Sequence, residues 1–118
     1  MSYVLFIVEP VGQRTERGLD KGHEVFQRMQ DFAAELKAQG VLLGVNSLES
    51  TRKATRLEVR QGRQTTTDGP FAEAKEMIGG YFLLNVESHE QALAIAARCP
   101  AADWATIEIR NTGPCYDD

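Results

Sequence analysis

Residues 68–76 read Asp-Gly-Pro-Phe-Ala-Glu-Ala-Lys-Glu, and no other stretch combines residues that set backbone direction with ionisable residues so densely. Gly69 can take a positive φ without steric cost, and Pro70 fixes φ at about −65°. This pair is therefore expected to set the direction of the chain and to aim Asp68 away from the preceding strand. The stretch lies between two parts of the chain that each read as strand, helix, strand, and it decides how they are joined.

The part before this stretch begins with a strand at Tyr3–Val8, which is apolar at both parities and is predicted to be central in a sheet. A helix follows and is expected to end at Gly40. Its apolar residues recur at the helical period: Val25, Phe26, Met29, Phe32, Ala33 and Leu36. Residues 41–48 form the second predicted strand, in which Gly44 marks a bulge or a close backbone approach.

A hairpin leads directly into Asp68. Residues 54–60 alternate strictly between apolar or β-branched and charged side chains, which predicts a strand with one face in water, nearer the edge of the sheet. Residues 61–63 turn the chain, and residues 64–67 return as the partner strand. Asp68 is therefore expected where a strand stops.

The part after Asp68 is predicted to start with one or two helical turns over residues 71–77, for which Pro70 is a suitable first residue and which Gly79-Gly80 ends. Residues 81–86 form a third strand that is apolar on both faces. Ser88 and Gln91 match a capping box, so a second helix is expected to run from there to Arg98. The last strand is predicted at 104–110.

This order of elements predicts an α+β fold, a ferredoxin-like split βαβ arrangement with an inserted β-hairpin. In that arrangement two helices cover one face of an antiparallel sheet and leave the other face bare. Because three predicted strands carry apolar residues on both faces, the bare face is expected to meet the sheet of a second copy, which makes a homodimer. Residues 1–110 are predicted to be a single domain, and residues 111–118 a C-terminal tail.

The composition excludes several classes of protein. A chain of 118 residues is long enough for one core but not for two. The net charge of −4 argues against a general nucleic-acid-binding protein. The first apolar run ends at Glu9 with no basic region before it, so we expect neither a signal peptide nor a membrane span. Cys99 and Cys115 lack the spacing of a metal or redox site, and we expect a cytoplasmic protein without metal or other cofactor.

The chain resembles the DGPF-domain, or YCII-related, family of small bacterial proteins over about residues 3–110. The resemblance rests on Asp68-Gly69-Pro70-Phe71, Glu73, Lys75-Glu76, Gly79-Gly80-Tyr81, residues 96–101 and Glu108-Ile109-Arg110. It implies a fold of the dimeric α/β-barrel type. Some proteins of the related branches have lyase-like or dehalogenating activity on small cyclic substrates, and others are associated with an alternative sigma factor. The resemblance therefore implies either kind of function for this chain.

Three residues are candidates for acid–base catalysis. Asp68 could act as a general acid or base if burial raised its proton affinity, or it could accept backbone N–H bonds and cap the following turn. His23, on the flank of the first helix, could partner Asp68 or bind a haem, or it could be an ordinary surface residue. Glu108, on the last strand, could project into the space between two sheets or lie on a wet face.

The candidate binding residues lie next to these. Pro70 and Phe71 form the rigid corner of the motif, and Glu73 shares a predicted helix face with Glu76, where solvation is the simpler explanation. Arg110 has the same parity as Glu108, so the two side chains could enter the space between sheets or pair with each other.

Two functions from different classes are consistent with these residues. The first is a small-molecule enzyme or binding protein that uses Asp68 with help from Glu108, Arg110 or His23. The second is a non-catalytic interaction protein, for instance an accessory to a sigma factor or a stress response, in which residues 68–71 form a recognition corner. A cavity that collects Asp68 with a second ionisable group would favour the first.

Overall fold

The computed structural model describes residues 2–116. Within them, four strands form one antiparallel sheet in the order β2-β5-β1-β6, and two form a separate hairpin, β3-β4. The strands are β1 (Tyr3–Pro10), β2 (Leu42–Ser47), β3 (Thr55–Arg60), β4 (Arg63–Asp68), β5 (Glu76–Leu84) and β6 (Thr106–Asn111). The helices are α1 (Gln13–Arg17), α2 (Leu19–Ala38) and α3 (His89–Arg98), with 3₁₀ turns η1 (Thr51–Lys53) and η2 (Pro100–Asp103).

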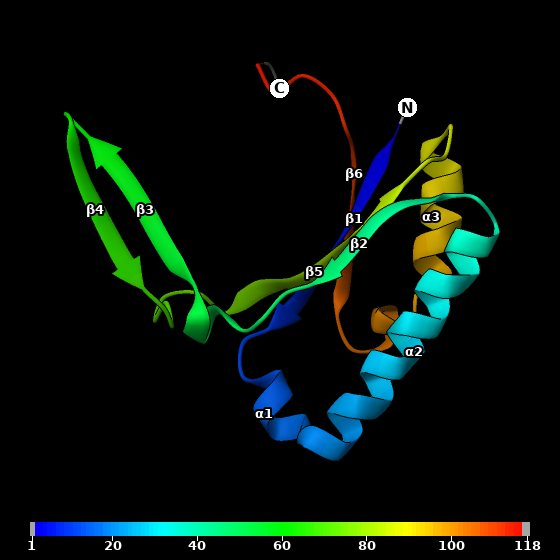
Figure 1. Ribbon diagram of the computed structural model, residues 1–118, viewed down its shortest axis with the longest axis horizontal. Helices are drawn as coiled ribbons and strands as arrows, with labels where there is room; N and C mark the ends of the chain where they lie inside the picture. Colours follow the sequence, from blue (N-terminus) through cyan, green and yellow to red (C-terminus); the bar gives the residue numbers. More distant parts are fainter. Residues whose placement is uncertain (1, 117–118) are drawn as a thin grey trace.

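This sheet order confirms the predicted α+β, ferredoxin-like split βαβ arrangement, with the β3-β4 hairpin inserted. β1 is central, as predicted, and pairs with both β5 and β6. Figure 1 shows α2 and α3 on one side of the sheet and the hairpin projecting from the other. One face of the sheet is therefore covered by helices, and the other face is free.

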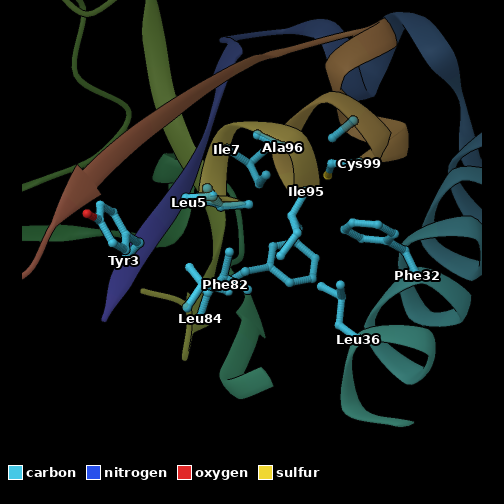
Figure 2. Packing of buried hydrophobic residues seen from close by; sticks show 13 residues of the cluster. Tyr3, Leu5, Ile7, Phe32, Leu36, Phe82, Leu84, Ile95, Ala96 and Cys99 are labelled. Carbon is cyan, nitrogen blue, oxygen red and sulfur yellow. The ribbon is translucent and has the colours of Figure 1, made fainter. Parts of the chain in front are cut away.

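The core lies between the helices and the sheet. Along β1 the side chains of Tyr3, Leu5 and Ile7 are buried on the helix side, as the two-residue period of a strand requires. Figure 2 shows Phe32 of α2 pointing toward Phe82 of β5, and their ring centroids lie 5.7 Å apart in an edge-to-face arrangement.

The predicted helix ends are confirmed where a local signal marks them. Gly40 follows α2 with φ 75°, a conformation that glycine adopts without strain. At the start of α3, the backbone N–H of Gln91 donates to Ser88 Oγ and the backbone N–H of Ser88 donates to Gln91 Oε1, each at 3.2 Å. Gly44 also lies at an irregularity in the β2–β5 register, as predicted.

The predicted helical turns over residues 71–77 are wrong. Only a single turn forms, in which the N–H of Ala74 donates to the carbonyl of Phe71, and β5 already begins at Glu76. The reason is a distant contact: the N–H of Val11, just after β1, donates to the carbonyl of Lys75 at 2.9 Å and draws this segment toward the sheet. Gly79 and Gly80 consequently lie inside β5 and end no helix.

The predicted role of Gly69 is also corrected. Gly69 has no positive φ, and its peptide bond to Pro70 is cis. Its N–H donates to the carbonyl of Ala54 at 2.8 Å, and a Cβ at this position would overlap the carbonyl oxygen of Thr51. Glycine is therefore required here by a close backbone approach.

The β3-β4 hairpin, called the arm below, consists of residues 55–68. Its turn places Gln61 at φ 54° and Gly62 at φ 76°, the two positive φ values of a tight hairpin turn. Side-chain alternation predicted one covered face, yet every arm residue is exposed in the single chain. In the single chain, the apolar face of the arm is therefore not covered, although the alternation of its side chains predicts that one face is.

Candidate functional site

A cleft of about 640 Å³ opens between α2 and the sheet. Figure 1 shows α2 diverging from β2 toward the helix N-terminus and α1, and the residues that line the cleft include Leu19 and His23 of this part of α2. The lining comes from the end of β1, from α1, from α2 as far as Ala33, from facing parts of β2 and β5, and from Ala101 and Trp104. Segments that are far apart in the sequence therefore meet around one cavity.

The floor of the cleft contains an ion pair between Glu9 and Arg14. Arg14 Nη2 donates to Glu9 Oε1 at 2.7 Å and Arg14 Nε donates to Glu9 Oε2 at 3.0 Å, so the ion pair is bidentate. Arg14 Nη1 also donates to the carbonyl of Leu48 at 3.0 Å. Glu9 is only 6% exposed, whereas Arg14 remains partly open to the cleft. The pair ties β1, α1 and the segment after β2 into one rigid floor.

The local sequence explains why this pair forms. Glu9 continues the inward-facing alternation of Tyr3, Leu5 and Ile7, and a buried carboxylate needs a charged partner. The β1–β5 register shifts so that Ile7 faces Gly80 and Val8 faces Ile78, which leaves Gly79 as the extra residue of a bulge. A Cβ at Gly79 would overlap Glu9 Oε1, so the glycine makes room for the carboxylate.

The walls of the cleft are apolar and unusually exposed. Phe26 is 47% exposed, and Leu19, Val45 and Leu48 are also exposed large apolar side chains that line the cleft. Clustered apolar exposure in a concave site is characteristic of ligand-binding surfaces. These four side chains offer an apolar ligand a surface that the folded chain itself leaves uncovered.

Polar side chains complete the lining. Arg17 donates to Gln13 Oε1 at 3.0 Å, and its guanidinium lies 5.6 Å from the ring centroid of Trp104. Glu9 and Glu49 balance Arg14 and Arg17 among the lining residues. The two acidic and two basic side chains of the lining therefore cancel in formal charge.

The structure places the three candidate catalytic residues apart. His23 lies on α2 and lines the cleft with an exposed side chain. Asp68 is the last residue of β4, outside the cleft lining, and its exposed carboxylate accepts a hydrogen bond from Thr55 Oγ1 at 3.2 Å. Glu108 is exposed on β6 at the position facing Phe6 of β1, in the same register as Arg110 facing Val4.

The candidate binding residues of the motif gather elsewhere. Pro70, Phe71 and Glu73 line a second hollow of about 270 Å³ beside the arm. The Arg56 guanidinium lies 3.7 Å from the ring centroid of buried Phe71, and Arg56 Nη1 donates to Glu73 Oε1 at 2.9 Å. The backbone N–H of Glu73 and the Arg56 side chain lower the pKa of the Glu73 carboxyl.

The sequence reasoning missed Glu9 and Arg14. The available signal was parity, because Glu9 stands at the position where the strand alternation calls for another buried side chain. An acidic residue at such a position predicts a buried partner, and Arg14 is the first basic residue after it.

Two further features bear on the class of protein. Within residues 2–116, no group of three or more His, Cys, Asp and Glu side chains is placed to hold a metal ion. Among the helices of the same residues, none combines the length and apolarity needed to cross a membrane.

Comparison with models of known protein families gives a match over nearly the whole chain. The model of the YCII-related domain family matches residues 1–114. No curated protein matches the chain.

Proposed function

The chain belongs to the YCII-related domain family, and we propose that it binds a small organic molecule in the cleft between α2 and the sheet. The observation that carries this proposal is the exposed apolar lining around a rigid polar floor. A volume of about 640 Å³ lies within the range of small-molecule sites, roughly 300–1,000 Å³.

The lining favours a ligand with an apolar body and one polar end. Phe26, Val45 and Leu48 provide apolar contact area. At the floor, Arg14 is held in place by Glu9 and by the carbonyl of Leu48, so its orientation is fixed before a ligand arrives. A ligand that carries a carboxylate or another hydrogen-bond acceptor can meet this guanidinium without reorganising it.

Within this proposal, acid–base chemistry fits His23 better than the other two candidates. An imidazole gives and takes protons near neutral pH, and His23 is the candidate that lines the cleft. Asp68 and Glu108 lie outside the lining of the same cavity. Their catalytic roles, like the association with a sigma factor, stay predictions.

The test is ligand-induced thermal stabilisation across a panel of small cyclic and aromatic molecules, each offered as the carboxylate and as the uncharged amide. Gly22 lines the cleft from α2, and a Cβ there would meet open space. Gly22→Phe therefore obstructs the cleft, and Gly22→Ala is the matched control, since it adds a helix-favouring methyl group and leaves the cavity open.

A ligand at a hundred times its Kd stabilises the folded state by about 2.7 kcal/mol, or roughly 10 °C in Tm for a domain of this size. We expect this shift in the wild type and in Gly22→Ala and its loss in Gly22→Phe. Equal shifts in all three proteins would show that the cleft is not the binding site.

A further inference from the structure

The charged side chains that line the cleft are paired unevenly. Glu9 is fully engaged by Arg14 in the bidentate pair of the cleft floor. Glu49 pairs at 3.7 Å with Lys53, which is not a lining residue, and the two side chains are 75% and 70% exposed. Among residues 2–116, no carboxylate lies within ion-pair distance of Arg17. Arg17 is therefore the arginine of the lining that the described chain leaves without an anionic partner.

Arg17 is nevertheless held in a defined position. Its Nη2 donates to Gln13 Oε1 at 3.0 Å, and Gln13 Nε2 donates in turn to the backbone carbonyl of Trp104 at 2.7 Å. The guanidinium also lies over the Trp104 ring, a contact that stabilises a cation without neutralising it. A guanidinium has five N–H groups, and within the described residues only one hydrogen bond, the one to Gln13, uses them here. Gln13 and Trp104 thus orient Arg17 and leave most of its donors available.

A second arginine at the same ring has the partner that Arg17 lacks. The Arg28 guanidinium lies 5.3 Å from the Trp104 ring centroid, and Arg28 pairs with Asp103 at 3.6 Å. Arg28 is not a lining residue, whereas the half-buried Arg17 is. A half-buried charge has lost part of its hydration, and a bound anion compensates for this loss. The chain supplies a carboxylate to the arginine outside the cleft and none to the arginine inside it.

Arg14 has little left to offer an anion. Its Nε and Nη2 donate to the two oxygens of Glu9, and its Nη1 donates to the carbonyl of Leu48. The second N–H of Nη2 is directed to the carbonyl of Gly79 at 3.5 Å. One N–H of Nη1 is then left for a ligand, and the charge of Arg14 is already balanced by Glu9.

We propose that Arg17 recognises the anionic group of the ligand, so that the cleft selects organic monocarboxylates with an apolar body. This inference rests on the small-molecule function proposed above and adds the residue that selects the charge of the ligand. The fork of a guanidinium binds a carboxylate through two parallel N–H···O bonds. A single unpaired guanidinium balances a single negative charge, so a phosphate dianion would bring a charge that the lining leaves without a partner.

The test measures, by isothermal titration calorimetry, the dissociation constant of an amide divided by that of the matching carboxylate. The probes are benzoate, cyclohexanecarboxylate, 3-phenylpropanoate and 2-naphthoate, each with its primary amide. Arg17→Gln removes the charge inside the cleft, and the matched control Arg28→Gln removes a charge from the same ring outside it. For the pair that binds best, we expect a ratio of at least about ten in the wild type and of about one in Arg17→Gln. In Arg28→Gln, the ratio should change by less than about threefold. A merely structural role of Arg17 would weaken both members of a pair equally and leave the ratio unmoved.

Three results would overturn the inference, and they differ in what they say of the cleft. Amides that bind the wild type as tightly as their carboxylates, with binding lost in Gly22→Phe, would overturn it and leave the proposed function standing. A preference for carboxylates that survives in Arg17→Gln would show that another group selects the charge. If no probe binds the wild type in either form, the inference fails together with the proposed function.

A variant that does not fold does not prevent the test, because the wild-type ratio is measured without any substitution. If Arg17→Gln is unfolded, Arg17→Lys replaces it. Lysine keeps the charge and loses the planar fork, so the ratio should fall at least about threefold. An unchanged ratio in Arg17→Lys would overturn the inference in that case.

Discussion

Substitution of Gly79 by Ala tests whether the bulge in β5 exists to accommodate the Glu9–Arg14 pair. A Cβ at this position would overlap Glu9 Oε1 and lie 2.7 Å from Glu9 Cδ and 2.9 Å from Arg14 Nη2. Carbon atoms in contact prefer a separation of about 3.5–4.0 Å, so the carboxylate must withdraw by about 1 Å. That displacement breaks the 2.7 Å hydrogen bond to Arg14 Nη2.

The size of the effect follows from burial. Disturbing a charge-assisted pair around a carboxylate that is 6% exposed costs about 2–4 kcal/mol. Replacing Gly by Ala within a strand stabilises the folded state by roughly 0.5–1 kcal/mol, because Ala loses less backbone conformational entropy on folding. We therefore expect a net loss of about 1–3.5 kcal/mol in the free energy of unfolding, measured by urea denaturation at fixed protein concentration with an unchanged slope.

Two controls separate the clash from other causes. Gly44 is also in a strand, but a Cβ there would meet Leu83 Cβ at an ordinary 4.0 Å, so Gly44→Ala should be neutral or stabilising. In a Glu9→Ala background, Gly79→Ala should cost little, which gives a coupling energy above about 1 kcal/mol. A Gly79→Ala protein as stable as the wild type would refute the reasoning.

Three further predictions concern single titratable groups. Asp68→Asn should cost at most about 1 kcal/mol of stability, because the exposed carboxylate accepts a hydrogen bond from Thr55 Oγ1 that an amide oxygen can also accept. The variant should bind ligand in the cleft as the wild type does, and a loss of binding would show that Asp68 contributes to the site. Burial raises the pKa of the Cys99 thiol, so the free energy of unfolding should fall as pH rises above the ordinary thiol range, and Cys99→Ala should remove this loss. In the native protein, the exposed Cys115 should react quickly with iodoacetamide, and the buried Cys99 should not. NMR titration should find the pKa of Glu73 below its usual range and rising in Arg56→Gln, and an unmoved midpoint would exclude the ion pair as a cause.

The fold could be predicted from sequence wherever the signal was local. The helical period of α2, the glycine after it and the capping box of α3 each depend on residues within a few positions of one another. The resulting order of elements was sufficient to predict the split βαβ arrangement. The start of β5 could not be found this way, because it depends on Lys75 accepting a hydrogen bond from Val11, which is distant in the sequence.

The site was less predictable for the same reason. Glu9 gave a parity signal, but its pairing with Arg14 and the space at Gly79 exist only in three dimensions. The position of His23 at the cleft depends on how far α2 diverges from the sheet. The periodicity of apolar residues in the sequence predicts the helix but not its distance from the sheet. The density of special residues in the motif suggested chemistry at Asp68, whereas the contacts of Gly69 and Phe71 show a strong local structural role.

The most direct test of the central claim is an NMR titration of ¹⁵N-labelled protein with the strongest-binding molecule of the panel. If the cleft is the binding site, the largest amide shifts should map to residues on its two walls, Gly22 and His23 of α2 and Asn46, Gly79 and Gly80 of the sheet. Shifts confined to residues beside the second hollow, such as Thr65 and Thr67, with the cleft amides unmoved, would contradict the account.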